Sequence, residues 1–164
     1  MEENQVLDFL EILKVLTKHK VSFIVVGGVC VVLHGAPVIT FDLDLVHSRS
    51  SQNLASLISA LNELDAFYRG RGDQRLKPKR SHLSSSGHQL LMTNAGPLDL
   101  LGTIGAGHTY KDLLKHTVEL EAGGLHLRML NLEKLIEIKS ETITDKDKVM
   151  LPILQHLLKE KQKQ

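Results

Sequence analysis

The sequence has little of several features that define specialised classes of protein. Its 164 residues include a single cysteine, Cys30, which excludes an intrachain disulfide and any cysteine-based metal site. No run of apolar residues approaches the roughly 20 that a membrane helix needs. The acidic start MEENQVLD also lacks the apolar region of a signal peptide. We therefore expect a cytoplasmic protein with no membrane partner.

Charge and histidine spacing exclude two further classes. The formal net charge is only +1, so the overall charge does not favour nucleic acid, and any basic surface must be local. The chain has 9 histidines, but none follows a metal-ligand spacing such as HExxH, so we predict no zinc site. The length fits one globular domain over residues 1–164.

Residues 23–47 carry the strongest local pattern in the chain. The pattern predicts a buried strand at 23–26, a turn at Gly27 and Gly28, a short apolar helix at 29–33, and a second strand at 40–46. We expect Gly35 to end the short helix in a left-handed conformation. Side chains alternate along a strand, so Asp42 and Asp44 should point to the same side.

Two neighbouring carboxylates destabilise a strand unless water or a cation neutralises them. A hard divalent ion such as magnesium takes oxygen ligands and would remove that cost. The free N–H groups of a Gly-Gly turn at a helix start suit phosphate. Gly27 and Gly28 together with Asp42 and Asp44 therefore predict a site for a metal-bound nucleotide.

A third carboxylate, Asp99, lies inside an apolar run. A strand at 88–93, a tight turn at 94–97 and a returning strand at 98–101 are predicted around it. An unpaired carboxylate there would be costly, so we expect Asp99 to share a cation with Asp42 and Asp44. The alternative is that Asp99 caps the turn or pairs with a basic residue.

The rest of the chain is predicted to be mostly helices and one hairpin. Apolar spacing predicts helices at 4–19, 51–64 with Ser51 as N-cap, 110–115, and 132–141 after an N-cap at Asn131. Alternating residues around Gly123-Gly124 predict a hairpin of strands 117–121 and 125–129. A last helix contains Pro152, where we expect a kink.

The order of strand, Gly-Gly, a 13-residue spacer and Asp-x-Asp resembles the DNA polymerase β-type nucleotidyltransferase superfamily. Within it, GGVCVVLHGAP and TFDLDL resemble the small bacterial AbiE-type toxin nucleotidyltransferases. GPLDLLG at 96–102 is similar to the family's third-carboxylate strand, and residues 130–139 with Lys146-Asp147 are similar to its C-terminal helical motif. The resemblance implies an α/β fold whose mixed sheet, about five or six strands here, is flanked by helices, with C-terminal helices at about 131–161.

The resemblance also implies a function. Such a protein is a metal-dependent nucleotidyltransferase that moves an NMP group from an NTP, such as ATP, to a hydroxyl of RNA, protein or a small molecule. Asp42, Asp44 and Asp99 would be catalytic and would bind Mg²⁺, in a two-metal site, while Gly27 and Gly28 would bind phosphates. A toxin-like role would bring an antitoxin-like partner protein.

Two features leave alternatives open. Lys139 and Asp147 would bind nucleotide by the resemblance, but their core-side positions equally suit a simple buried pair. Relatives often have Arg where this chain has Val38 and Thr144. Those two positions favour the alternative function, a non-catalytic nucleotide-binding or protein-interaction module on the same fold.

The segment 69–82 is the one basic, turn-rich stretch, and it is predicted to be a surface loop. It is either a solvated connection or an electrostatic arm for triphosphate or an RNA-like acceptor. Aromatic residues are missing from it beyond Tyr68, so base stacking is not expected. We expect His34 and His47 to hydrogen-bond to the backbone, with a catalytic role as the alternative.

Overall fold

The computed structural model describes residues 2–141 and 143–163, with side chains from Phe9 onward. Its helices are α1 (Glu2–Lys18), α2 (Gly27–Leu33), α3 (Ser51–Glu63), α4 (Arg80–Leu83), α5 (Tyr110–Leu113), the 3-10 helix η1 (Leu114–His116), α6 (Leu132–Glu141) and α7 (Asp145–Gln162). Its strands are β1 (Phe23–Val26), β2 (Leu43–His47), β3 (Phe67–Tyr68), β4 (His88–Thr93), β5 (Gly96–Leu101), β6 (Thr103–Ile104), β7 (His108–Thr109), β8 (Thr117–Ala122) and β9 (Leu125–Leu130).

Among the described residues, one sheet has seven strands in the order β3-β4-β5-β2-β1-β9-β8, and β6 and β7 form a separate pair. The large sheet is mixed: β2 runs parallel to β5, and β1 parallel to β9, while the other neighbours are antiparallel. The α/β class with a mixed sheet is therefore confirmed. The expected count of five or six strands is wrong, because β3 is too short to show a periodicity and was not predicted as a strand.

The central strands β1 and β2 form the core of the sheet. Every residue of β1 is buried, and Leu43 and Leu45 of β2 are fully buried. Helix α2 buries Val29, Cys30 and Val31 against them. Burial raises the pKa of the Cys30 thiol to about 12, so this cysteine is a neutral core residue. Burying an aliphatic side chain such as that of Val29 or Val31 contributes about 1.5–3 kcal/mol. This burial fixes the position of α2 relative to β1.

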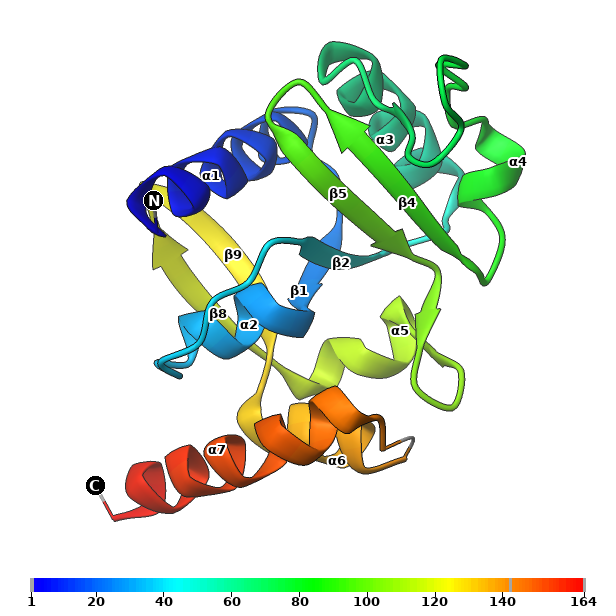
Figure 1. Cartoon of the computed structure of the whole chain (residues 1–164). Coiled ribbons are helices and arrows are strands. Elements are labelled where there is room, and N and C mark those ends of the chain that lie inside the picture. The colour runs from blue at the N-terminus through cyan, green and yellow to red at the C-terminus, as the bar shows by residue number, and fades with distance from the viewer. Residues whose placement is uncertain (1, 142, 164) are drawn as a thin grey trace.

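The helices lie on both sides of this sheet (Figure 1). Helices α6 and α7 pack on each other at one end of the molecule, and α3 and α4 lie at the opposite end. Pro152 lies inside α7 without ending it. None of the described helices combines the length and the apolar character that a membrane span requires.

Two of the predicted helix caps are confirmed, and one is shifted by a residue. Asn131 caps α6 by accepting a hydrogen bond from Lys134 N at 2.8 Å. The N-cap of α3 is Ser50, whose hydroxyl accepts from Asn53 N, and not Ser51 as predicted. Gly35 follows α2 with a positive φ of 99°, the predicted left-handed end.

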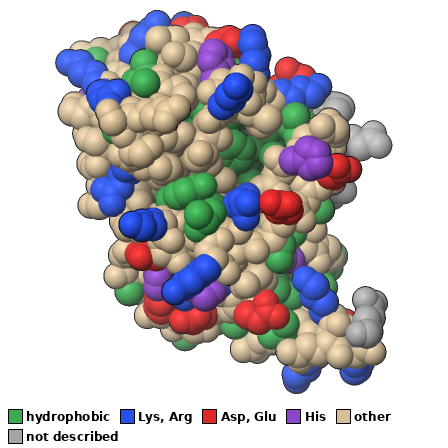
Figure 2. Space-filling view, turned by 180° about the vertical axis from the view of Figure 1, so that it is seen from behind, with side chains coloured by type: hydrophobic (Ala, Val, Ile, Leu, Met, Phe, Trp, Pro, Cys, Tyr) green, Lys and Arg blue, Asp and Glu red, His purple; other side chains and the backbone are tan. Residues whose placement is uncertain are grey.

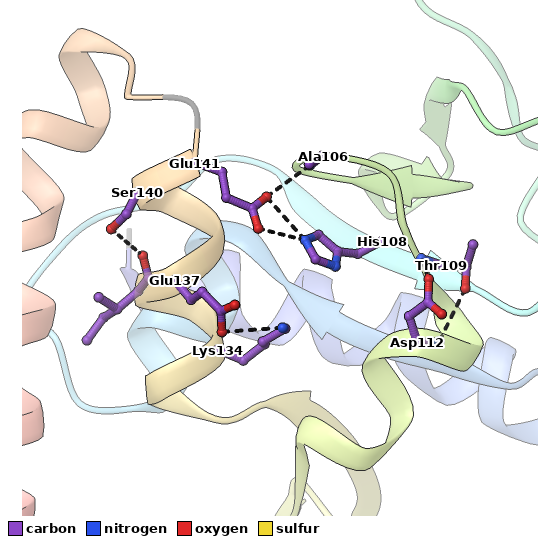
Figure 3. Close-up of polar contacts among 9 residues, drawn as sticks. Ala106, His108, Thr109, Asp112, Lys134, Glu137, Ser140 and Glu141 are labelled. Carbon is purple, nitrogen blue, oxygen red and sulfur yellow. Dashed lines mark hydrogen bonds and ion pairs between the residues drawn. The ribbon is translucent and has the colours of Figure 1, made fainter.

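The glycine-rich segment after β5 has regular structure. It forms the β6–β7 hairpin, which is tied to the end of α6 (Figure 3). The Glu141 carboxylate accepts a hydrogen bond from Ala106 N at 2.9 Å and contacts the His108 ring at 2.8 Å. These contacts fix the last turn of α6, the helix that carries Lys139.

Candidate active site

Asp44 and Asp99 are direct neighbours in the sheet. Strands β2 and β5 run parallel with Asp44 in register with Asp99, and β4 places Leu90 opposite Asp99. Register partners on adjacent strands present their side chains to the same face. The two carboxylates therefore lie side by side in the middle of the sheet, as the sequence predicted.

Gly27 lies directly against the Asp44 side chain. It begins α2 with a φ of 65°, and a Cβ atom at this position would collide with the Asp44 carboxylate. A Cβ atom at Gly28 would collide with the Thr40 hydroxyl in the same way. Both glycines are thus required by a close approach, of the Asp44 side chain to Gly27 and of the Thr40 side chain to Gly28.

The environment of Asp44 disfavours its charged form. Burial, together with the adjacent Asp99 carboxylate and the charge of Asp42, raises the pKa of Asp44 to about 7. The positive charge of Lys146, at the start of α7, acts in the opposite direction. Within the described part of the chain, no basic side chain forms an ion pair with Asp44. Asp44 therefore lies where a bound cation would relieve an electrostatic cost.

Asp99 has a different partner, Arg69. The Arg69 guanidinium donates to Asp99 Oδ1 at 2.6 Å, and its other terminal nitrogen lies 3.7 Å from Asp42 Oδ1. Pairing with a basic residue is the alternative that the sequence left open for Asp99, and it is present here. Sequence reasoning missed Arg69 because it reads as one of several basic residues in a loop.

Asp42 lies just before β2, which begins at Leu43 and not at residue 40 as predicted. Its side chain is 53% exposed, so it faces solvent at the edge of the site. Asp42 and Asp99 share Arg69 as a partner. The negative charge of Asp42 also raises the pKa of Asp44. Arg69 thus contacts Asp42 and Asp99, while Asp44 lies against Gly27.

The three carboxylates supply the oxygen donors that a hard divalent cation takes. The close approach of Asp44 to Gly27 leaves its carboxylate against the backbone of the turn. In the arrangement that the described residues adopt, no group of three or more acidic, histidine or cysteine side chains is placed to hold a metal ion. Arg69 contacts two of the three aspartates instead.

Lys139 and Asp147 form an ion pair that links α6 to α7. The Lys139 Nζ lies 3.3 Å from Asp147 Oδ1, and both side chains are less than one-fifth exposed. Asp147 also accepts a hydrogen bond from Thr144 N at 3.1 Å, while the Thr144 hydroxyl accepts from Asp147 N. The structure therefore contains the simple pair, and a nucleotide-binding role for these two residues stays a prediction.

Thr144 has a structural role where a cation was expected. It is the N-cap of α7 and forms a capping box with Asp147. The spacing Thr-x-x-Asp at 144–147 is a sequence signal for such a cap and could have identified it. Val38 is half-buried and packs against the core.

The two histidines nearest the site bond to the backbone, as predicted. Each Nε2 atom lies 2.7 Å from a carbonyl oxygen, that of Leu130 for His34 and that of Leu83 for His47. A carbonyl can only accept, so each ring donates through Nε2. Burial lowers the pKa of both rings, which keeps them neutral.

The basic segment 69–82 extends from the end of β3 and includes α4. Arg75 lies over the Phe67 ring, with its guanidinium carbon 4.3 Å from the ring centroid, and Lys77 lies 4.0 Å from Asp65. Apart from Arg69, most of its charged side chains are exposed. Its role as an arm for triphosphate or acceptor remains a prediction.

Other hollows lie away from the carboxylates. One of about 250 Å³ is lined by residues from the end of α1, the start of β1, Tyr110 and β9. Figure 2 shows a face on which hydrophobic side chains gather near the centre, with basic and acidic groups around them. These hollows lack the paired carboxylates that define the site at Gly27.

Three solved structures share the fold of this chain. LnuA, a lincosamide antibiotic adenylyltransferase with lincomycin bound, aligns with a TM-score of 0.61 and 16% identity over 92% of this chain and 96% of LnuA. The antibiotic-resistance factor ANT(2'')-Ia gives 0.61 and 15% over 96% of this chain and 86% of that one. TM1012 of Thermotoga maritima, a protein assigned as a nucleotidyltransferase, gives 0.53 and 17% over 79% and 81%.

The chain therefore has the nucleotidyltransferase fold, an α/β fold with a mixed sheet flanked by helices and a C-terminal helix. No protein-family model and no curated protein sequence matches it. At identities of 15–17%, the likeness establishes the fold. The AbiE-type subfamily remains a prediction from the sequence.

Proposed function

We propose that the chain is a metal-dependent nucleotidyltransferase, which moves an NMP group from an NTP to a hydroxyl of an acceptor. One observation carries the proposal: Asp44 and Asp99 lie in register on adjacent strands, directly beside the turn at Gly27. Two acids in such contact are costly without a cation. A metal-bound triphosphate would supply that cation.

The roles of the residues follow from their places. Asp42 and Asp44, with Asp99, would hold magnesium, and Gly27 and Gly28 would present their backbone to the phosphates. Bound magnesium would neutralise the charge on the attacking and leaving oxygens. We add Lys146 as a phosphate contact, because its charge already acts on Asp44. Lys139 could reach a phosphate only by leaving Asp147, 3.3 Å away.

The reaction is an in-line displacement. The oxygen of the acceptor hydroxyl forms a bond to the α-phosphorus, and the bond from that phosphorus to the bridging oxygen breaks. Pyrophosphate leaves with the electron pair. Asp99 either accepts the proton of the acceptor hydroxyl or would hold a metal ion that binds that hydroxyl. The chain contributes position and charge more than covalent chemistry.

The fold neighbours favour ATP and a small-molecule acceptor as the first substrates to test. LnuA is a lincosamide adenylyltransferase, and ANT(2'')-Ia is an antibiotic-resistance factor. RNA and protein hydroxyls, and control by an antitoxin-like partner, belong to the same proposal because the resemblance of the sequence implies them. The nature of the acceptor decides between an antibiotic-modifying and a toxin-like role.

A second candidate is a non-catalytic nucleotide-binding module. Two observations favour it: Arg69 already neutralises two of the carboxylates, and Val38 and Thr144 supply no cation. Such a module would bind nucleotide at Gly27 and Gly28 without transferring it. The same chain can therefore be tested for both functions in one assay.

The test is transfer of label from α-labelled NTPs with magnesium, offered separately to lincosamide antibiotics, cellular RNA and cellular protein. We expect labelled acceptor and released pyrophosphate from the natural chain and from the control variant, and none from Asp44→Asn. Asp73→Asn is the matched control, because Asp73 is exposed and lies in the basic segment. Nucleotide binding without transfer to any acceptor would support the module instead.

A further inference from the structure

Arg69 reaches the carboxylates from the edge of the sheet. It follows the two-residue edge strand β3, in which Tyr68 pairs with Leu91 of β4. Its backbone N–H donates to the Leu90 carbonyl at 3.1 Å, and Leu90 is the register partner of Asp99. The Arg69 backbone is therefore fixed across β4 from Asp99, and its side chain spans that strand.

The contact with Asp99 is short and largely removed from water. The Asp99 side chain is 12% exposed and that of Arg69 is 25% exposed, at a nitrogen–oxygen distance of 2.6 Å. A charge-assisted bond of this kind is among the stronger polar contacts in proteins. The second contact, to Asp42 at 3.7 Å, draws a more exposed carboxylate toward the same guanidinium.

We propose that Arg69 is a positioning residue that acts as the resident counter-ion of Asp99 and Asp42, and that it must leave Asp99 before a divalent metal ion binds there. The inference rests on the metal site of the proposed function. A guanidinium and a metal ion at the same carboxylate repel each other over a few ångströms. In the arrangement that the described residues adopt, no three acidic, histidine or cysteine side chains form a metal site, and Arg69 contacts two of the three aspartates.

The departure of Arg69 would change the segment that follows it. Residues 70–77 are exposed, and few contacts hold them: Tyr68 N donates to the Leu76 carbonyl, and Arg75 and Lys77 lie 3.9 and 4.0 Å from Asp65. Arg69 is the connection between this basic segment and the carboxylates. Metal binding should therefore loosen the segment.

The first test measures Mn²⁺ binding by the spin-resonance signal of the free ion, at constant ionic strength. We expect Arg69→Gln to bind Mn²⁺ about tenfold more tightly than the natural chain, within the usual range of coupling between sites. Arg71→Gln removes the same charge from an exposed position nearby and should change affinity by less than about twofold. Equal or weaker binding by folded Arg69→Gln would overturn the proposal.

A second variant and a second measurement distinguish the loss of the Arg69 charge from misfolding of the variant. Arg69→Lys keeps the charge and should bind Mn²⁺ with an affinity between those of the natural chain and Arg69→Gln. Mn²⁺ should speed trypsin cleavage at Arg71 and Arg75 in the natural chain, while Arg69→Gln should be cut quickly with or without metal. Protection of the segment by metal would contradict the proposal.

The outcomes separate the two proposals. Equal metal affinity in the natural chain and in Arg69→Gln leaves the metal site standing and removes the role of Arg69. Absence of Mn²⁺ binding in every variant removes the metal site itself, and the role of Arg69 with it.

Discussion

The α6–α7 junction and the carboxylate edge both place aspartates against a basic side chain, yet their charges balance differently. At the junction, Lys139 faces one aspartate, Asp147, which is also fixed by the cap of α7. At the edge, Arg69 faces Asp99 and Asp42, and Asp44 has no ion-pair partner among the described residues. A balanced pair connects two helices, whereas an excess of buried carboxylate favours the binding of a cation.

The largest effect is expected at the carboxylate edge. Asp99→Asn should lower the rate of nucleotidyl transfer by at least about a hundredfold, as is typical when one electrostatic group of an active site is lost. The measurement is the initial rate of label transfer to the acceptor that the labelling assay identifies. Circular dichroism is the control, because the change also removes the partner of Arg69. A folded variant with full activity would exclude Asp99 from the chemistry.

Gly27→Ala should have the next largest effect, because it forces Asp44 away from the turn. A methyl group at this position collides with the Asp44 carboxylate, and its φ of 65° is unfavourable for alanine. We expect a loss of about 2–3 kcal/mol in the free energy of unfolding, measured by urea titration. Gly124→Ala is a matched control, because its φ is also positive at 81° and nothing lies within 4 Å of its added Cβ. Equal losses in both variants would show that the contact with Asp44 is unimportant.

A substitution at the α6–α7 junction should lower the stability of the fold and leave metal affinity unchanged. Asp147→Ala removes the partner of Lys139 and one half of the α7 cap, so we expect a loss of about 2 kcal/mol in the free energy of unfolding. Its affinity for magnesium should match that of the natural chain. A large loss of metal affinity would instead place Asp147 in the site.

The pH dependence of stability should also distinguish the two regions. The pKa of Asp44 is raised from 3.8 to about 7, so the folded state holds a proton that the unfolded state releases. Stability is then greatest below the unfolded pKa and falls as the pH rises through about 7. Allowing for partial exposure, we expect Asp44 to account for a loss of about 2 kcal/mol between pH 4 and pH 8 without metal.

The check is urea unfolding of the natural chain and of Asp44→Asn across that pH range. The variant carries no charge at this position, so its stability should fall less with pH. Identical pH profiles would show that Asp44 is not the destabilised acid.

The local pattern of the sequence was enough to predict the strands and the glycine pair around Asp44. The strand, the Gly-Gly turn and the alternation of Asp42 and Asp44 depend on neighbouring residues, and the apolar run around Asp99 indicated a third central strand. The adjacency of Asp99 to Asp44 follows once those strands pair. These predictions needed only short-range periodicity and the resemblance of the segment order.

The role of Arg69 could not be predicted in the same way. Its contact with Asp99 depends on the register of β3 on β4 and on β4 lying beside β5, two long-range pairings. A strand of two residues, Phe67–Tyr68, carries no periodicity from which that register could be read. The capping box at Thr144, in contrast, was visible in the sequence, where Thr144 had been read only as a missing cation.

The most direct test of the central claim is a calorimetric titration of magnesium into the natural chain and into Asp44→Asn. We expect the natural chain to bind magnesium and Asp44→Asn to lose most of that affinity, because no basic side chain among the described residues forms an ion pair with Asp44. Equal affinity in the two proteins, or no binding by either, would contradict the claim that the carboxylate edge is a cation site.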